Sequence, residues 1–125
     1  MPLSNDPDGA LTQIRDAALA LPEVEERASH GQPTFFVAGR MFAQFRHNHH
    51  GDGRTVLAVR TGEDEEATML VEAAPELYST VAYLRRGWVG LAVGRPDTDW
   101  AHVADWIARS WAGSAPARLL EAGAR

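Results

Sequence analysis

Two adjacent side chains with reactive chemistry stand out first. A hydroxyl beside an imidazole, as in Ser29-His30, can act as a nucleophile and its base. Neighbouring residues rarely present that geometry, and the sequence shows no acid placed to orient the imidazole. We therefore expect no catalytic residues and no enzyme activity. His30 and Gln32 are better interpreted as polar contacts of a ligand-binding loop.

A second group contains three histidines and one acid, namely His47, His49, His50 and Asp52. Imidazole nitrogens are good ligands for Zn, Ni and Cu. Adjacent residues, however, point in different directions, and only one carboxylate is near enough to complete a first shell. A loop rich in His, Asn and Gly is typical of a solvated hairpin tip. We predict no metal and no cofactor.

Four consecutive acids, Glu63, Asp64, Glu65 and Glu66, resemble a metal-binding ridge. Acids in the first turn of a helix also interact favourably with the positive end of the helix dipole. We favour this second explanation.

Arginine supplies all twelve basic residues of the chain. Residues 33–60 and 81–95, which read mainly as strands, each carry a net charge of +3. Arginines on one surface would bind phosphates without sequence preference. The total charge of −5 is unusual for a DNA-binding domain, and arginine at strand ends is also ordinary solvation. The candidate nucleic-acid or anion-binding residues are Arg40, Arg46, Arg54, Arg60, Arg85 and Arg86.

The elements that position these residues follow from apolar periodicity. Apolar residues at helical spacing predict a first helix over 8–21, which Pro22 ends. Further helices are expected from Thr61, with a capping-box spacing to Asp64, and from Asp99. Strands are expected on either side of Gly39-Arg40, over 54–60 and over 87–93.

The hairpin is expected to turn at Gly39-Arg40, because Gly at the first loop position suits a type II′ turn. Ala38 then pairs with Met41, and Thr34, Phe36, Ala43 and Phe45 share that face with them. We expect this face to be the core. The opposite face is expected to be partly wet and holds Phe35, Val37, Phe42, Gln44 and Arg46.

The predicted order is helix, three strands, helix, strand, helix. This order indicates an α+β fold in which helices pack on one face of an antiparallel sheet. The 125 residues form a single domain, 1–125, and a monomer is favoured. The absence of cysteine, of a long apolar run and of a signal peptide favours a cytoplasmic protein without membrane contact.

Several short motifs, in this order and at this spacing, resemble the MmcQ/YjbR family of small bacterial proteins. The resemblance spans about residues 10–120 and implies a double-wing fold related to the CyaY-like superfamily, with a DNA-binding role. Two positions depart from the family pattern, Arg40 for Lys and Trp111 for Tyr. The matching pieces are Leu21-Pro22-Glu23, His30-Gly31-Gln32-Pro33-Thr34-Phe35, Gly39-Arg40-Met41-Phe42-Ala43, Trp88-Val89, Asp99-Trp100, Ser110 and Pro116-Ala117-Arg118-Leu119.

Two functions follow as hypotheses. The first is a non-enzymatic protein that binds DNA or another nucleic acid through its arginine-bearing wing or sheet surface. The alternative is a module for a small anionic ligand or a protein partner, which would use the hairpin face with Phe35, Val37 and Phe42 and the loop around His30 and Gln32.

Overall fold

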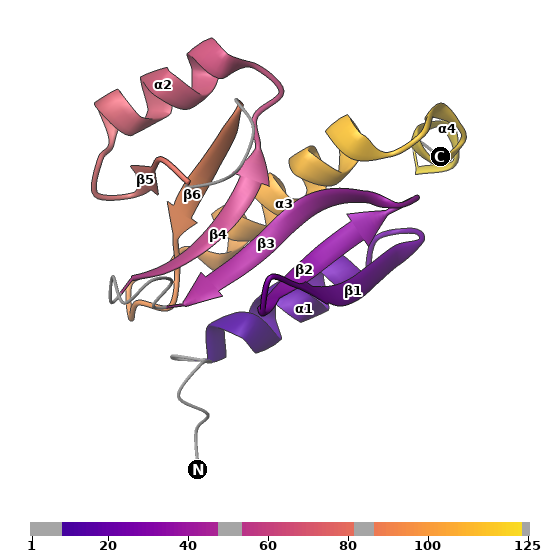
Figure 1. The fold of residues 1–125 in the computed structure, drawn as a ribbon, viewed down its shortest axis with the longest axis horizontal. Helices are drawn as coiled ribbons and strands as arrows, with labels where there is room; N and C mark the ends of the chain where they lie inside the picture. Colours follow the sequence, from indigo (N-terminus) through magenta and orange to yellow (C-terminus); the bar gives the residue numbers. More distant parts are fainter. Residues whose placement is uncertain (1–8, 48–53, 82–86, 124–125) are drawn as a thin grey trace.

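The computed structural model describes residues 9–47, 54–81 and 87–123. Its six strands form one antiparallel sheet in the order β1-β2-β3-β4-β6-β5, which confirms the predicted α+β class (Figure 1). The elements are α1 (Ala10–Leu19), β1 (Val24–Ser29), β2 (Gln32–Val37), β3 (Arg40–His47), β4 (Thr55–Arg60), α2 (Asp64–Ala73), β5 (Tyr78–Ser79), β6 (Trp88–Ala92), α3 (Trp100–Ser114) and α4 (Ala117–Gly123).

Helices α1 and α3 lie together behind the sheet in Figure 1, and α2 packs against β5 and β6. Side chains alternate along each strand, so Leu57 and Val59 join the core while Val56 and Ala58 point to the opposite side. We call this opposite side, which α1 and α3 do not cover, the open face of the sheet.

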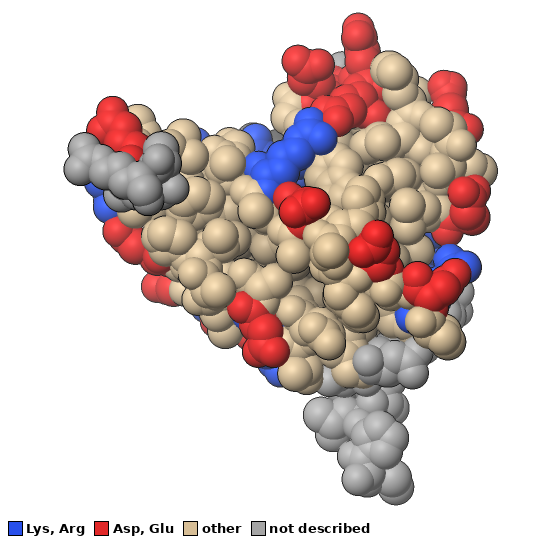
Figure 2. Space-filling model, turned by 180° about the vertical axis from the view of Figure 1, so that it is seen from behind, with Lys and Arg blue, Asp and Glu red and all other residues tan. Residues whose placement is uncertain are grey.

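Acidic side chains outnumber basic ones on the side of the molecule that carries the helices. Figure 2 views this side, and red side chains are spread over it with few blue ones among them. The negative total charge of −5 is therefore visible as a negative helical side. A polyanion would be repelled there.

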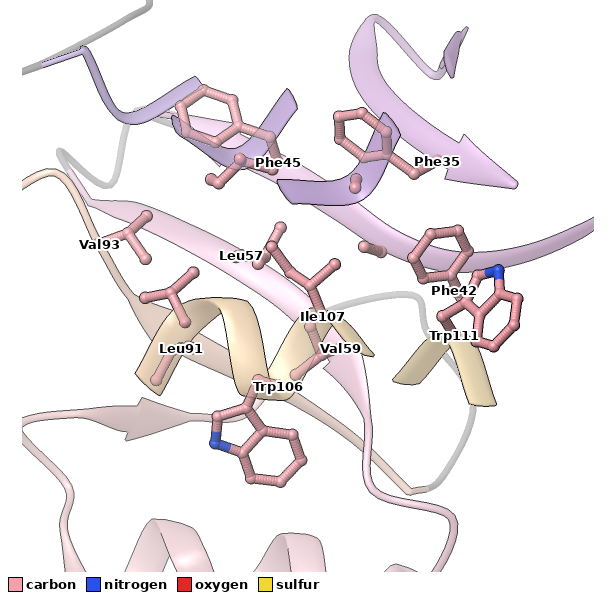
Figure 3. Packing of buried hydrophobic residues seen from close by; sticks show 14 of the residues in the cluster. Phe35, Phe42, Phe45, Leu57, Val59, Leu91, Val93, Trp106, Ile107 and Trp111 are labelled. Atoms are coloured by element: carbon pink, nitrogen blue, oxygen red, sulfur yellow. The ribbon is translucent and has the colours of Figure 1, made fainter. Parts of the chain in front are cut away.

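Three phenylalanines form the centre of the core between the sheet and the helices (Figure 3). Phe35, Phe42 and Phe45 are each at most 1% exposed. Ile107 and Trp111 of α3 pack against them. Full burial of side chains of this size stabilises the fold by about 1.5–3 kcal/mol each.

The prediction for the hairpin turn was wrong, as were the faces given to the residues from Thr34 to Phe42, whereas Ala43 and Phe45 face the core as predicted. Val37 pairs with Arg40, and the turn is Ala38-Gly39, whose φ values of 50° and 80° are those of a type I′ turn. A β-bulge follows, because Phe35 pairs with Ala43 and Phe36 with Met41, which leaves Phe42 as an extra residue.

These register changes exchange the side chains that face the core. Phe35, Val37 and Phe42 are fully buried, whereas Phe36 and Met41 are only half-buried. A slip of one residue moves a strand's side chains to the other face, and burying the larger aromatic pair favours the observed register. The hypothesis of a ligand surface made by Phe35, Val37 and Phe42 is therefore also wrong.

Strand β1 was not predicted. Its residues are mostly charged and its burial alternates, with Glu25 and Arg27 exposed and Glu26 half-buried. Charged residues are common on edge strands, where they discourage unwanted pairing, and they hide the apolar pattern by which strands are recognised. The loop into β2 is accordingly the short turn His30-Gly31.

The three predicted helices form as α1, α2 and α3, but the residue that precedes α2 differs from the predicted cap. Asp99 caps α3 by accepting a 3.2 Å bond from the amide of His102, as its position before the helix predicts. Helix α2 instead begins at Asp64, and the Thr61 hydroxyl accepts from the amide of Glu63 rather than from a helical amide. The capping box predicted there does not form.

No helix in the described ranges combines the length and the hydropathy needed to span a bilayer.

Candidate functional site

Polar side chains gather at one end of the open face, where β1 and β3 finish and β2 begins. Gln44 Nε2 donates to Thr34 Oγ1 at 2.9 Å and to the carbonyl of Ser29 at 3.4 Å. Arg46 Nε donates to Gln44 Oε1 at 2.8 Å. We call Gln32, Thr34, Gln44 and Arg46 the polar cluster.

Three of the four residues of the cluster are buried, on the face that α1 and α3 do not cover. Thr34, Gln44 and Arg46 are 0%, 4% and 6% exposed. Burial lowers the pKa of the Arg46 guanidinium, because the charged form loses hydration. The group remains protonated at neutral pH, so the cluster holds a fixed positive charge in a partly desolvated setting.

The His30-Gly31 turn forms the rim of this cluster. Gln32 follows the turn directly, and its carbonyl accepts a 2.9 Å bond from Thr34 Oγ1. His30 is exposed, with a φ of 53°. The structure thus brings three sequence candidates, His30, Gln32 and Arg46, to one end of the open face.

The same turn brings the Ser29 and His30 side chains into contact. Ser29 Oγ and His30 Nδ1 are 3.4 Å apart. In the part of the chain that the structure describes, no carboxylate bonds to His30.

Of the other arginine candidates that the structure describes, Arg40 and Arg60 lie away from Arg46, whereas Arg54 lies at the same end of the sheet, because Arg46 pairs with Val56 and His47 with Thr55. Arg40 and Arg54 are exposed at opposite ends of the sheet, since β3 runs from Arg40 toward the β4 end where Arg54 lies. Eight residues of strand span roughly 26 Å at about 3.3 Å each. Arg60 Nη1 donates to Ser114 Oγ of α3 at 2.9 Å, and Arg85 and Arg86 lie outside the described residues.

Three of the four residues of the histidine loop, His49, His50 and Asp52, lie outside the described residues. His47 Nδ1 is 2.8 Å from Thr55 Oγ1 across the β3–β4 ladder. Among the residues that the structure does describe, no three acidic or imidazole side chains converge as a metal site.

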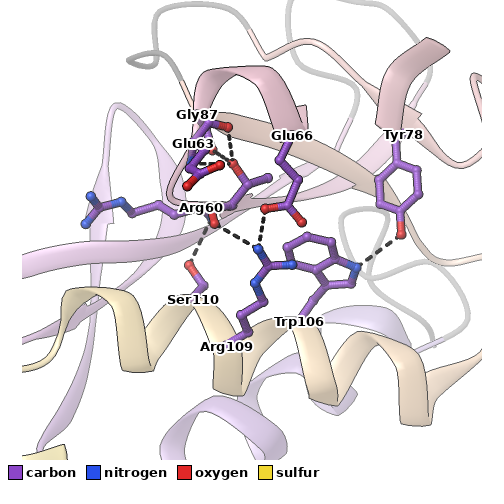
Figure 4. Close-up of polar contacts among 9 residues, drawn as sticks. Arg60, Glu63, Glu66, Tyr78, Gly87, Trp106, Arg109 and Ser110 are labelled. Carbon is purple, nitrogen blue, oxygen red and sulfur yellow. Dashed lines mark hydrogen bonds and ion pairs between the residues drawn. The ribbon is translucent and has the colours of Figure 1, made fainter. Parts of the chain in front are cut away.

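One of the four acids, Glu66 of α2, takes part in a contact between helices (Figure 4). Arg109 of α3 donates to the carboxylate of Glu66 and, at 3.0 Å, to the carbonyl of Thr61. The hydrogen bond from Arg109 lowers the pKa of Glu66, and Glu66 in turn raises the pKa of Arg109. Arg109 also lies over the Trp106 ring at 4.7 Å.

A groove of about 490 Å³ lies between α2 and β6. Its lining includes Trp88 and two acidic residues, Asp64 and Glu72. Two carboxylates repel an anion, so this groove and the polar cluster suit ligands of opposite charge.

Ser110 has a structural role that the sequence did not reveal. Its hydroxyl donates to the carbonyl of Phe42, the bulge residue. It also accepts a 2.9 Å bond from the amide of Arg60 (Figure 4). The hydroxyl therefore bridges β3 and β4 where their direct pairing ends, after Ala43 and Val59.

Thr34 and Gln44 are the site residues that were not proposed as candidates. One signal was present: Gln44 and Arg46 are polar residues two apart within an apolar strand, and such residues share a face. Thr34 joins them only through the register of β2 on β3, which the sequence reading placed one residue off.

Comparison with solved structures supports the fold. The crystal structure of Deinococcus radiodurans protein DR2400, which has a DUF419 domain, is similar with a TM-score of 0.65 and 17% identity over 86% of this chain and 78% of that one. No curated protein is similar enough in sequence to match the chain. The model of the YjbR family matches residues 19–112, which include the whole sheet and most of α3. The chain belongs to the YjbR family.

Proposed function

We propose that this protein is a non-enzymatic binding module that takes a small anionic ligand, a phosphate or carboxylate compound, on the open face beside Arg46. The observation that carries the proposal is the burial of Arg46 in the polar cluster, within the face that α1 and α3 leave uncovered. His30 and Gln32 at the rim add further polar groups.

The physical support is electrostatic. A guanidinium that is planar and always charged matches the geometry of phosphate and carboxylate oxygens. The bond from Arg46 Nε to Gln44 Oε1 fixes the plane of the guanidinium, so less side-chain entropy is lost when an anion binds. Partial desolvation also strengthens each charge–charge contact.

The experiment is a thermal-shift and calorimetric titration with phosphate, citrate and nucleoside monophosphates. We expect at least one anion to raise the melting temperature of the natural protein in a concentration-dependent way. Arg46→Met should abolish the shift. Arg40→Met, which removes an exposed arginine at the far end of the sheet, should preserve it.

Two results would overturn the proposal. One is the absence of any shift in the natural protein across the whole panel. The other is an equal shift in the natural protein and in Arg46→Met, because binding would then occur elsewhere.

DNA binding, the first hypothesis from the sequence, is the second candidate, and the exposure of Arg40 and Arg54 favours it. The burial of Arg46 and the bond from Arg60 to α3 leave less arginine for phosphate contacts than that hypothesis requires. Fluorescence anisotropy with duplex and single-stranded DNA at low salt separates the two. Salt-sensitive binding that Arg40→Met and Arg54→Met weaken would favour nucleic acid over the small anion.

A further inference from the structure

Strand β1 ends the sheet with a long exposed edge. The order β1-β2-β3-β4-β6-β5 gives the sheet two edges, and β5 at the other end has only two residues against six in β1. Among the described strands, none pairs with the outer side of β1 (Figure 1). Such an edge presents backbone groups that can pair with another strand.

The turn before β2 determines which backbone groups point outward. His30 and Gly31, with φ values of 53° and 79°, form a two-residue turn of type I′. Ser29 and Gln32 are then a hydrogen-bonded pair, and alternation makes Arg27 and Glu25 bond to β2 as well. The N–H and C=O groups of Val24, Glu26 and Ala28 therefore point away from the sheet.

We propose that β1 pairs with β1 of a second copy of this chain, antiparallel about a two-fold axis through Glu26. Val24 of one copy then faces Ala28 of the other, and Glu26 faces Glu26. These are all residues with outward backbone groups, so each pair exchanges two hydrogen bonds. The two sheets become one continuous sheet.

Charge complementarity selects this register. Glu25 and Arg27 both point to the open face, and the pairing sets Glu25 of each copy opposite Arg27 of the other at about 4.5 Å between Cα atoms. A shift by two residues in either direction sets Arg27 against Arg27 or Glu25 against Glu25, which is destabilising. A shift by one residue would mismatch the outward backbone groups.

The side chains of β1 are already arranged for this contact. Arg27 lies over the Phe36 ring at 4.1 Å, which holds the guanidinium on the open face. Its pair with Glu25 in the same strand is long, at 3.4 Å, and both side chains are more than half exposed. Little free energy is therefore lost when Arg27 and Glu25 separate and pair with Glu25 and Arg27 of the second copy.

The opposite face of β1 tolerates the two-fold axis because Glu26 is neutralised. Arg15 of α1 donates to both carboxylate oxygens of Glu26, at 2.7 and 2.8 Å. Two Glu26 side chains can therefore meet at the axis without uncompensated repulsion. The sequence favoured a monomer, and these pairings become visible only once the order of the strands in the sheet is known.

The first test is sedimentation velocity over a range of protein concentrations. We expect a monomer–dimer equilibrium in the natural protein. Ala28→Pro removes an outward N–H that β2 does not use, so it should abolish the dimer and leave the fold intact. Circular dichroism and thermal melting check that the monomer remains folded.

A second test reverses the charges of Glu25 and Arg27 and does not rely on the proline variant. Glu25→Arg should weaken the dimer because Arg faces Arg across the axis, and the double variant Glu25→Arg with Arg27→Glu should restore it. Glu72→Arg, the same charge change on an exposed site of α2, is the matched control and should leave dimerisation unchanged.

Cross-linking tests the register itself. The chain has no cysteine, so Glu26→Cys introduces a single thiol at the axis. A hydrogen-bonded pair has about 5.5 Å between Cα atoms, within disulfide range, and mild oxidation should give a covalent dimer. Glu65→Cys on α2 should not. A protein that is monomeric at all concentrations, or a dimer that neither Ala28→Pro nor Glu25→Arg weakens, would overturn the proposal.

Discussion

Arg46 donates a 2.8 Å hydrogen bond from Nε to Oε1 of Gln44, two residues earlier in the same strand. Residues two apart share a face, so this contact is local. It is nevertheless buried, and Gln44 also bonds to Thr34 of the neighbouring strand. The Arg46–Gln44 contact thus depends on spacing within β3, and the Gln44–Thr34 contact depends on how β2 pairs with β3. Together they hold a charged group in the face that we propose binds an anion.

Replacement of Gln44 tests how much the polar cluster contributes to stability. Gln44→Leu leaves the buried Arg46 and Thr34 without a partner that they have in the natural protein. We expect the free energy of unfolding to fall by about 1–3 kcal/mol, measured by urea denaturation. Gln13→Leu, at an exposed site of α1, should change it by no more than about 0.5 kcal/mol. Equal effects of the two substitutions would contradict this prediction.

Removal of the Ser110 hydroxyl should destabilise the sheet at the point where β3 and β4 cease to pair directly. Ser110→Ala leaves the buried carbonyl of Phe42 and the amide of Arg60 without their bridge. We expect a loss of about 1–3 kcal/mol and faster hydrogen exchange at the Arg60 amide. Ser114→Ala removes only a side-chain bond to Arg60 and should leave that amide protected. Unchanged exchange at Arg60 in Ser110→Ala would show that the bridge is dispensable.

Gly90 is required by a close approach of β5. A Cβ at position 90 would lie 2.9 Å from Ser79 Oγ and 3.3 Å from Val81 Cγ1. Gly90→Ala should therefore destabilise the protein by about 1–3 kcal/mol, as overpacking does. The double variant with Ser79→Ala should recover part of that loss, because the nearest atom is gone. Two additive effects in thermal or urea unfolding would contradict this explanation.

The ion pair between α2 and α3 predicts an acid dependence of stability. The hydrogen bond from Arg109 lowers the pKa of Glu66 below its ordinary value of 4.5. A carboxyl with a depressed pKa stabilises the fold above that value, and the contribution is lost as the pH falls further. The pair is partly exposed, so the contribution is at most about 1 kcal/mol.

Urea midpoints between pH 3 and pH 6 measure this effect. Glu66→Gln should be less stable than the natural protein at pH 6, and the difference should shrink toward pH 3. Glu72→Gln, on the exposed side of the same helix, should show no such change with pH. A constant difference between Glu66→Gln and the natural protein would mean that the pair does not titrate with folding.

The sequence by itself determined the α+β class and most elements, because these depend on short-range patterns. Apolar residues at helical spacing placed α1, and Asp99 marked the start of α3. Alternating and β-branched residues placed β4 and β6. The order of short motifs also identified the YjbR family.

Only the tertiary structure decided which faces meet. Phe42 is the bulge residue because three aromatic side chains fit the core better in that register, and no local rule selects it. Strand β1 forms because β2 offers an edge, although its own residues are mostly charged. Arg46 was separated from Arg40 and Arg60, and joined to Thr34, by contacts between strands and helices that are distant along the chain. Such contacts are set by packing, which spacing along the sequence does not contain.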